Sequence, residues 1–193
     1  MNKILIITAH PSSKNLTKAI ADIYQTEREK KGDKVEIIDL YTDKQMPFLA
    51  FETHHDLAKK DEVRDYYQAK IKQADEIVFV YPFWWGTMPA ILKNWLDSVL
   101  TIGFAAFYNE KGRPVGLLQG KSVRIFSTSG APTFFYCING IRRANKKIWK
   151  QTIVELCGMK FEGYHLFGGV DTSGKNVEKN STIIIVSRYL DII

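Results

Sequence analysis

The stretch Tyr81-Pro82-Phe83-Trp84-Trp85-Gly86-Thr87-Met88-Pro89-Ala90-Ile91-Leu92-Lys93 decides the fold of this chain. It follows the apolar run 77–80, whose length and β-branched content predict a fully buried strand. It leads into a segment with apolar residues at helical spacing, namely Leu92, Trp95, Leu96, Val99 and Leu100. Pro89 fits the first helical position, where no amide hydrogen is needed. Residues 82–88 are therefore expected to form a loop at the carboxyl end of a central parallel strand, where open α/β sheets bind ligands.

Length and composition predict one globular domain. The 193 residues suffice for one substantial core and are few for two, so a single domain over 1–193 is expected. Hydrophobic residues make up 45% and charged residues 25%, which argues against a disordered or fibrous chain. No apolar run approaches the ~20 residues of a membrane span, and the N-terminal run is too short for a secretory signal. We therefore expect a cytoplasmic protein.

Charge and cysteine content exclude some functions. A net charge of +6 suits an anionic ligand such as a dinucleotide, but the basic residues are scattered, so a solvated surface is favoured over nucleic-acid binding. Cys137 and Cys157 form no Cys-x-x-Cys motif and are interpreted as buried thiols. His54-His55 has no partner at metal-ligand spacing, so no metal is expected.

Strand and helix patterns alternate along the chain. Strands are predicted at 3–8, 35–40, 76–80, 121–128 and 160–167, and Asn15 is a plausible N-cap of the first helix. The helix after residue 133 is expected to present Trp149, Thr152, Ile153, Leu156 and Cys157 and to end at Gly158. This alternation predicts a doubly wound α/β domain of three layers, with five parallel strands in the order 2-1-3-4-5. In that order the loops after residues 8, 81 and 128 meet at one edge of the sheet.

Three segments lack a clear period. Residues 41–60 are interpreted as a long, functional loop, and 102–120 as an irregular excursion. The latter carries Phe104, Phe107 and Tyr108, and so many aromatics outside a periodic element suggest a surface covered by a second copy of the chain. We therefore expect a homodimer. The alternation of strands and helices along the chain predicts a helix at 175–190. The β-propensity of the run 183–186 favours a strand instead, and both alternatives stay open.

The three converging loops have complementary chemistry. The first offers Ser12, Ser13, Asn15 and Thr17 beside His10 at a helix start, which suits a phosphate, although ordinary capping explains it equally well. Neither Gly-x-Gly-x-x-Gly nor a P-loop occurs. The second loop offers Phe83, Trp84 and Trp85 as a stacking surface. The third offers Thr128, Ser129 and Gly130, whose glycine allows close backbone approach. A phosphate end and a flat heteroaromatic end together describe a flavin nucleotide.

The chain resembles the flavodoxin-like NAD(P)H:quinone oxidoreductases, the family of DT-diaphorase and its bacterial relatives. The resemblance lies in Ala9–Ser12 with Asn15-Leu16, Pro82–Lys93, Gly103–Ala105, Ser127–Gly130 and Cys157-Gly158. It implies a flavodoxin-like fold and a flavin, FAD or FMN. It also assigns residues to the two ends of that flavin: His10, Asn15, Leu16 and Thr17 for the phosphate region, and Pro82, Phe83, Trp84, Trp85, Thr128, Ser129 and Gly130 for the ring.

The resemblance also implies a ping-pong reaction, in which NAD(P)H passes a hydride to the flavin and a quinone then accepts two electrons. In DT-diaphorase a Tyr and a His after the third loop assist. Tyr136 matches that Tyr only if one residue is inserted, and Arg142 stands at the position of the His. An arginine is always charged, so it could stabilise a reduced anionic flavin but not relay protons. A solvated Arg142 beside Arg143 is an equal alternative.

The leading hypothesis is thus a flavin-dependent oxidoreductase that uses NAD(P)H to reduce quinones, or related nitro or azo compounds. A one-electron carrier of the flavodoxin type is a second hypothesis, but the charge of +6 and the segment 102–120 argue against it. A third is a regulatory ancillary flavoprotein of a potassium-efflux system. The sequence leaves open FMN or FAD, NADH or NADPH, and the acceptor.

Overall fold

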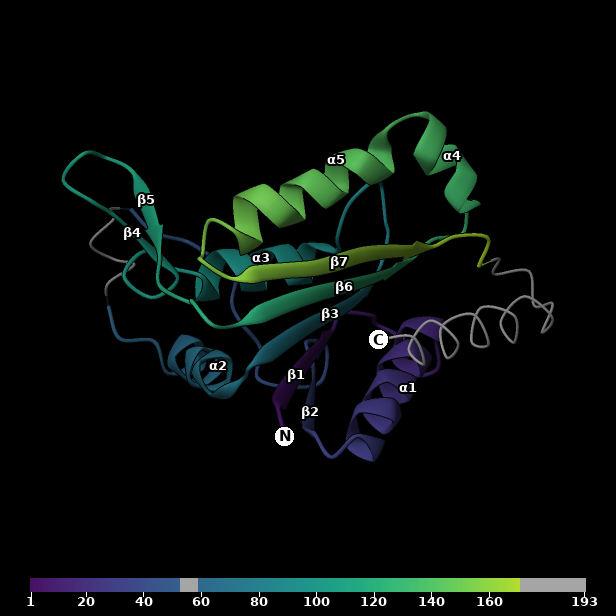
Figure 1. The fold of residues 1–193 in the computed structure, drawn as a ribbon, viewed down its shortest axis with the longest axis horizontal. Coiled ribbons are helices and arrows are strands. Elements are labelled where there is room, and N and C mark those ends of the chain that lie inside the picture. Colours follow the sequence, from purple (N-terminus) through teal and green to yellow (C-terminus); the bar gives the residue numbers. More distant parts are fainter. Residues whose placement is uncertain (53–58, 171–193) are drawn as a thin grey trace.

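The computed structural model describes residues 1–52 and 59–170 (Figure 1). The tail expected at 175–190 and the pair His54-His55 lie outside the described residues.

A parallel sheet forms the middle layer of the molecule. Within the described residues it has five strands in the order β2-β1-β3-β6-β7, which is the predicted 2-1-3-4-5 order because β6 and β7 are its fourth and fifth strands. The strands are β1 Lys3–Thr8, β2 Lys34–Asp39, β3 Glu76–Pro82, β6 Ser122–Thr128 and β7 Lys160–Phe167. Every residue of β3 is buried, as expected for the central strand of a sheet covered on both faces.

Helices cover the two faces of the sheet (Figure 1). They are α1 Leu16–Lys30, α2 Glu62–Gln73, α3 Ala90–Val99, α4 Thr133–Ile138, α5 Ile141–Lys147 and the π-helix η2 Ile148–Val154. Apolar residues of α2, α3 and η2 pack on one face of the sheet, and those of α1 pack on the other. The predicted three-layer architecture is confirmed.

Helix ends follow the local sequence closely. The side chain of Asn15 accepts the Lys18 amide hydrogen at 2.8 Å, so the predicted N-cap is confirmed. Gly158 has φ +81° and donates to Glu155, while the next amide donates to the Val154 carbonyl, which is a Schellman motif. Pro89 is the N-cap of α3 and not its first residue, because its ψ of 149° is extended.

The helical face predicted after residue 133 is partly wrong. Trp149 and Cys157 are buried as expected, but Thr152 is exposed and Leu156 is 37% exposed. The cause is the π-helix η2, whose wider turns rotate the side chains away from the positions that a 3.6-residue period gives. The buried residue that this winding brings to the core is Val154.

The segment 102–120 contains a hairpin that the sequence analysis missed. Strands β4 Ala106–Tyr108 and β5 Pro114–Gly116 pair antiparallel. Asn109 organises the connection, because its side-chain oxygen accepts the amide hydrogens of Lys111 and Arg113 at 3.0 Å each. Gly116 lies so close to the turn at Gly158 that a Cβ there would be 2.1 Å from the Gly158 nitrogen.

The two cysteines have different environments. Cys157 is buried, but Cys137 is exposed, so the expectation of two buried thiols is wrong for Cys137. The cause is that α4, which carries Cys137, buries none of its residues. Among the residues that the structure describes, no helix is long and apolar enough to cross a membrane. The same residues contain no group of three or more His, Cys, Asp or Glu that could hold a metal ion.

Candidate functional site

The loop between β1 and α1 is ordered by its own polar side chains. Nδ1 of His10 accepts the Ser12 amide hydrogen at 3.1 Å, and the side-chain amide of Asn15 donates to the Ser12 carbonyl. Partial burial lowers the pKa of His10, with smaller opposing effects from its bond to Ser12 and the charge of Asp39. His10 is therefore a neutral acceptor at pH 7, and the loop closes directly onto the first turn of α1.

Short contacts join the three predicted loops. The Thr17 hydroxyl on α1 lies 3.4 Å from the Thr128 hydroxyl at the end of β6, and both side chains are buried. The Phe83 amide donates to the Thr128 carbonyl at 2.6 Å, which extends the pairing of β3 with β6 beyond Pro82. The rings of His10 and Trp84 have centroids 5.8 Å apart. The loops thus meet at the carboxyl edge of the sheet, as the strand order predicts.

The aromatic loop after β3 is a tight turn. Trp84 and Thr87 exchange two backbone hydrogen bonds of 3.0 Å, and the residues between them, Trp85 and Gly86, have φ of +49° and +81°. Two positive φ values are typical of a type I′ turn, but a tryptophan in this region is costly and needs support from its surroundings.

Asn145 supplies that support from α5. Its side chain is 5% exposed and donates to the Gly86 carbonyl at 2.8 Å and to the Ile141 carbonyl at 3.1 Å. It thus connects the aromatic turn to a helix 59 residues later in the chain. Sequence reasoning missed this residue, since no local pattern distinguishes it from a surface asparagine.

The third loop is fixed by the segment that follows β7. The Ser129 amide donates to Phe167, and the Val170 amide donates back to the Ser129 carbonyl at 3.0 Å. Gly168 passes so close to Thr133 that a Cβ there would lie 2.2 Å from the Thr133 nitrogen. Gly130 has open space instead, because a Cβ there would meet only the Val170 carbonyl oxygen, at 3.9 Å.

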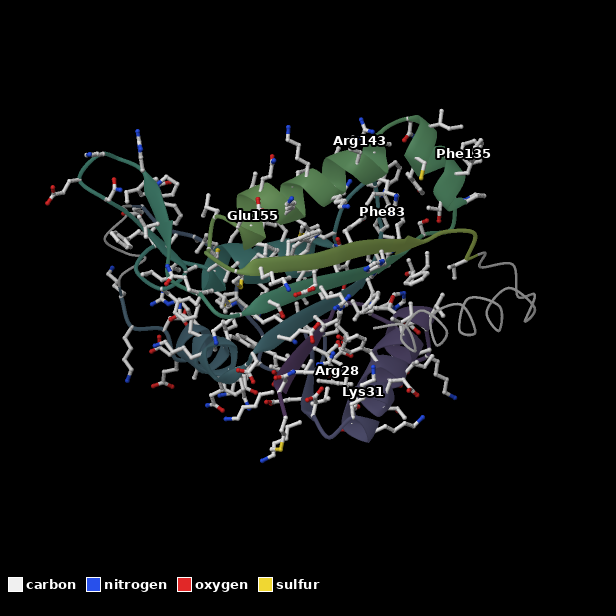
Figure 2. The ribbon with its side chains drawn as sticks, in the orientation of Figure 1. Arg28, Lys31, Phe83, Phe135, Arg143 and Glu155 are labelled. Atoms are coloured by element: carbon white, nitrogen blue, oxygen red, sulfur yellow. The ribbon has the colours of Figure 1, made fainter. Side chains whose placement is uncertain are left out.

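These loops enclose a cavity of about 330 Å³. Ten of the twelve predicted cofactor-binding residues line it: His10, Asn15, Leu16, Thr17, Pro82, Phe83, Trp84, Thr128, Ser129 and Gly130. Lys14 and Val170 complete the lining, and the sequence analysis named neither for this role. Lys14 could have been suspected as a cation beside a phosphate site, whereas Val170 is reached only through tertiary contacts. Figure 2 shows Phe83 near the carboxyl ends of the strands, below α5.

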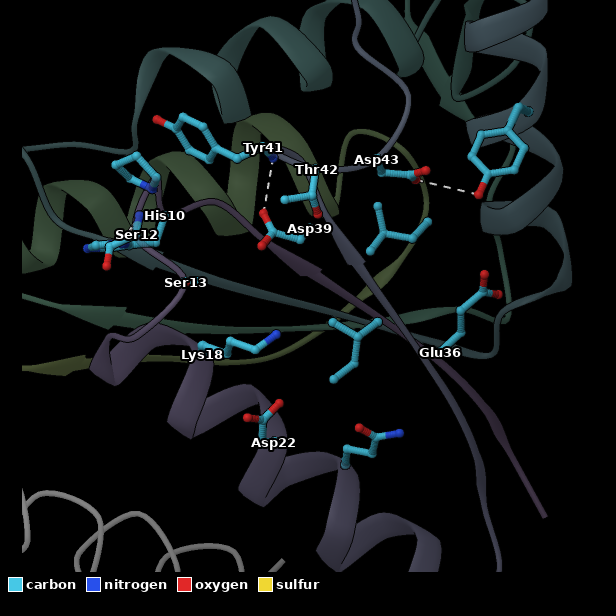
Figure 3. Close-up of a pocket in the computed structure, with 15 residues that line it drawn as sticks. His10, Ser12, Ser13, Lys18, Asp22, Glu36, Asp39, Tyr41, Thr42 and Asp43 are labelled. Atoms are coloured by element: carbon cyan, nitrogen blue, oxygen red, sulfur yellow. Dashed lines mark hydrogen bonds between the residues drawn. The ribbon is translucent and has the colours of Figure 1, made fainter.

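The two other predicted cofactor-binding residues lie outside this cavity. Ser12 lines a neighbouring cavity of about 610 Å³ between α1 and the strand β2 with the residues that follow it (Figure 3). His10 lines both cavities, so they are adjacent. Trp85, which has a positive φ, is fully exposed.

The predicted catalytic pair does not line the cavity either, but Tyr136 lies beside it. The Tyr136 ring on α4 packs edge-on against Phe83, with centroids 5.0 Å apart. Arg142 on α5 is half-buried, and its Nε is buried with no hydrogen-bond partner among the described residues. Arg143 is exposed, as the alternative of solvated arginines expects, whereas Arg142 is half-buried, so its role stays a prediction.

Below the cavity lies a buried polar cluster between the sheet and η2. The Trp149 indole donates to the Tyr81 hydroxyl at 2.6 Å, and burial raises the pKa of Tyr81 well above its ordinary value. Burial also raises the pKa of Tyr164 to about 12. Both hydroxyls are therefore protonated and neutral at pH 7.

A family model described as "Flavodoxin-like fold" matches residues 2–183. An uncharacterized NAD(P)H oxidoreductase of Haemophilus influenzae is 35% identical over 169 residues, which cover 86% of this chain and 83% of that protein. The ribosyldihydronicotinamide dehydrogenase (quinone) of Mus musculus is 28% identical over 203 residues, which cover 92% of this chain and 86% of that protein. Among solved structures, Smu.1420 from Streptococcus mutans UA159 is 31% identical with a TM-score of 0.81, and the match covers 99% of this chain and 100% of that chain.

Proposed function

This chain belongs to the flavodoxin-like NAD(P)H:quinone oxidoreductase family, and we propose that it binds a flavin, FMN or FAD, and transfers two electrons from NAD(P)H to quinones or similar acceptors. The observation that carries the proposal is the cavity of about 330 Å³ at the carboxyl edge of the sheet, lined by three loops that are far apart in the sequence. Its volume falls within the range of about 300–1,000 Å³ of small-molecule sites.

The residues present fit the two ends of a flavin mononucleotide. At one end, the first turn of α1 offers backbone amide hydrogens and the Thr17 hydroxyl, and Lys14 adds a positive charge, which together suit a phosphate. At the other end, Phe83 and Trp84 offer apolar surface, and the open space beside Gly130 lets a flat ring approach the backbone. Ser12 and Trp85 would join this set only if the ligand extends beyond the cavity or the turn moves.

A bound flavin supplies the chemistry, because it accepts hydride from NAD(P)H and donates two electrons to a quinone. The protein holds and polarises it. If Arg142 faces the bound flavin, its permanent positive charge can stabilise the negative charge of a reduced ring, but it does not transfer a proton. The Tyr136 hydroxyl is the candidate donor to the acceptor oxygen, held in place by the contact of its ring with Phe83.

The experiment that tests the proposal is the visible spectrum of the purified protein without oxygen. A flavin absorption that bleaches with NADH or NADPH and recovers with a water-soluble quinone is expected. Absence of flavin after incubation with FMN and with FAD would overturn the proposal.

Two pairs of variants test the residues. Trp84→Ala should raise the dissociation constant of the flavin because it removes cavity surface, whereas Trp85→Ala should do so only if the exposed indole contacts the bound ring. Arg142→Ala should lower the flavin reduction potential, and Arg143→Ala is the matched control. An unchanged potential in Arg142→Ala would remove Arg142 from the site.

The proposal includes a homodimer in the cytoplasm, the compartment that supplies NAD(P)H. An apolar groove of about 690 Å³ between α3 and η2 supports the second copy, since its lining residues Leu49, Phe51, Ile148 and Leu156 are 37–45% exposed. The hairpin residues Phe107 and Tyr108 are also exposed, at 40% and 61%. Sedimentation equilibrium tests this state, and a monomer at micromolar concentration would contradict it.

A further inference from the structure

The segment from α4 to the end of η2 has an unusual charge. Residues 133–154 contain no Asp or Glu and five basic residues, Arg142, Arg143, Lys146, Lys147 and Lys150. The net charge of the whole chain is +6, so this segment accounts for most of the excess. The basic residues look scattered in the sequence as a whole, but here they fall on two consecutive helices.

The helices place four of these cations on one exposed surface. Arg143, Lys146, Lys147 and Lys150, here called the basic face, are exposed, while Asn145 and Trp149 are the buried residues between them. Figure 2 shows Arg143 on the side of α5 that points away from the sheet. Within the described part of the chain, one of the four has an acidic partner, since Lys150 lies 3.7 Å from Glu155.

An apolar projection adjoins the basic face. Phe134, Phe135 and Ile138 on α4, here called the apolar tip, are 66%, 60% and 69% exposed. Helix α4 buries none of its residues, and Figure 2 shows Phe135 on its outer side. The tip therefore protrudes, whereas a peptide-binding groove would be concave. It also lies beside the candidate site, because Tyr136 of the same helix contacts Phe83.

We propose that the apolar tip and the basic face together dock on an anionic lipid bilayer. Aromatic and aliphatic side chains beside several Lys and Arg are the pattern of proteins that lie in the membrane interface, where the apolar groups enter the headgroup boundary and the cations bind lipid phosphates. Docking would bring the membrane close to the candidate site, because Tyr136 of α4 contacts Phe83 in the lining of the cavity. A consequence for the substrate rests on the proposed function: the electron acceptors include quinones whose apolar chains are dissolved in the bilayer.

Two other occupants fit the surface less well. In a twofold dimer the basic face of one copy would contact the basic face of the other, so the four cations would face like charges. A nucleic acid would satisfy the cations but leave three large apolar side chains of the tip in water. A bilayer satisfies both halves of the surface at once.

The test is co-sedimentation of the full flavin-loaded chain with vesicles of phosphatidylcholine alone or with one-third phosphatidylglycerol. Binding to the anionic vesicles and little to the neutral ones is expected, with a decrease at high salt. Lys146→Glu/Lys147→Glu and Phe134→Ser/Phe135→Ser should each lower the partition coefficient at least about tenfold. The matched control is Lys31→Glu/Lys34→Glu, which makes the same charge change at two exposed lysines. Figure 2 shows Lys31 on the opposite side of the sheet from α5.

Three results would overturn the docking proposal. One is no binding to anionic vesicles. Another is an equal loss in the control variant. The third is conversion of a dimer to a monomer by Phe134→Ser/Phe135→Ser, which would assign the tip to contact between copies. Reduction of a water-soluble quinone is measured in parallel and should be unchanged in all variants. Its absence in the parent protein would refute the proposed function without affecting the vesicle result.

Discussion

Replacing Asn145 by Ala should weaken flavin binding although Asn145 does not line the cavity. Its side chain donates two hydrogen bonds, one to Gly86 in the aromatic turn and one within α5. The bond to Gly86 helps to hold Trp85 at φ +49°, a backbone region that costs an L-residue about 1–2 kcal/mol. Without it, the turn can relax toward conformations that do not match the ligand.

The magnitude follows from the hydrogen bonds. Each such bond contributes about 1 kcal/mol net, and leaving a partly buried carbonyl unpaired costs about 1–3 kcal/mol. The turn keeps its two bonds between Trp84 and Thr87, which limits the relaxation. A loss of about 1–2 kcal/mol at the turn corresponds to a dissociation constant raised roughly 5–30-fold.

The assay is a titration of apoprotein with FMN, followed by the quenching of flavin fluorescence. Asn139→Ala is the matched control, because Asn139 is an exposed asparagine whose side-chain oxygen accepts the Ile141 amide hydrogen at 3.1 Å at the start of the same helix. It should change thermal stability slightly and leave the dissociation constant unchanged. An Asn145→Ala protein that loses stability but binds FMN as tightly as the parent would refute the role of Asn145 in positioning the turn.

Three further measurements test the structure away from the turn. Glu76→Gln should lower the free energy of unfolding by about 3 kcal/mol or more in a urea titration, because it leaves Arg124 buried without its counter-charge; a loss below 1 kcal/mol would contradict the buried pair. Burial, with a smaller effect from Arg124, lowers the pKa of His165 to about 4. In the unfolded chain the pKa of His165 is near 6.5, so between pH 6.5 and 4 the unfolded state binds more protons than the folded state. The free energy of unfolding should therefore fall as the pH drops from about 6.5 to 4, and His165→Gln should reduce this dependence on pH. A thiol reagent should modify exposed Cys137 rapidly and spare Cys157, whose pKa burial raises to about 11; equal rates would mean that the core opens there.

Apolar periodicity determined the architecture. Short apolar runs rich in β-branched residues predicted the strands of the main sheet, and the 3.6-residue period predicted its helices. The order 2-1-3-4-5 followed from the alternation of these elements. Helix ends were predictable at Asn15 and Gly158 for the same reason, since a cap depends on residues within one turn of it. The strand order also predicted that three loops would meet, and ten of the twelve cofactor-binding candidates line one cavity there.

The tertiary structure decided what depends on distant contacts or on local departures from ideal geometry. The direction of Trp85, the supporting bond from Asn145 and the place of Val170 in the cavity all come from segments that meet only after folding. The π-helix changed which side chains of its segment are buried, because a small change in winding shifts every later residue around the axis. Short-range patterns are thus set by neighbouring residues and can be read from the sequence, whereas hydrogen bonds and packing between distant residues depend on the positions of the whole sheet and its helices.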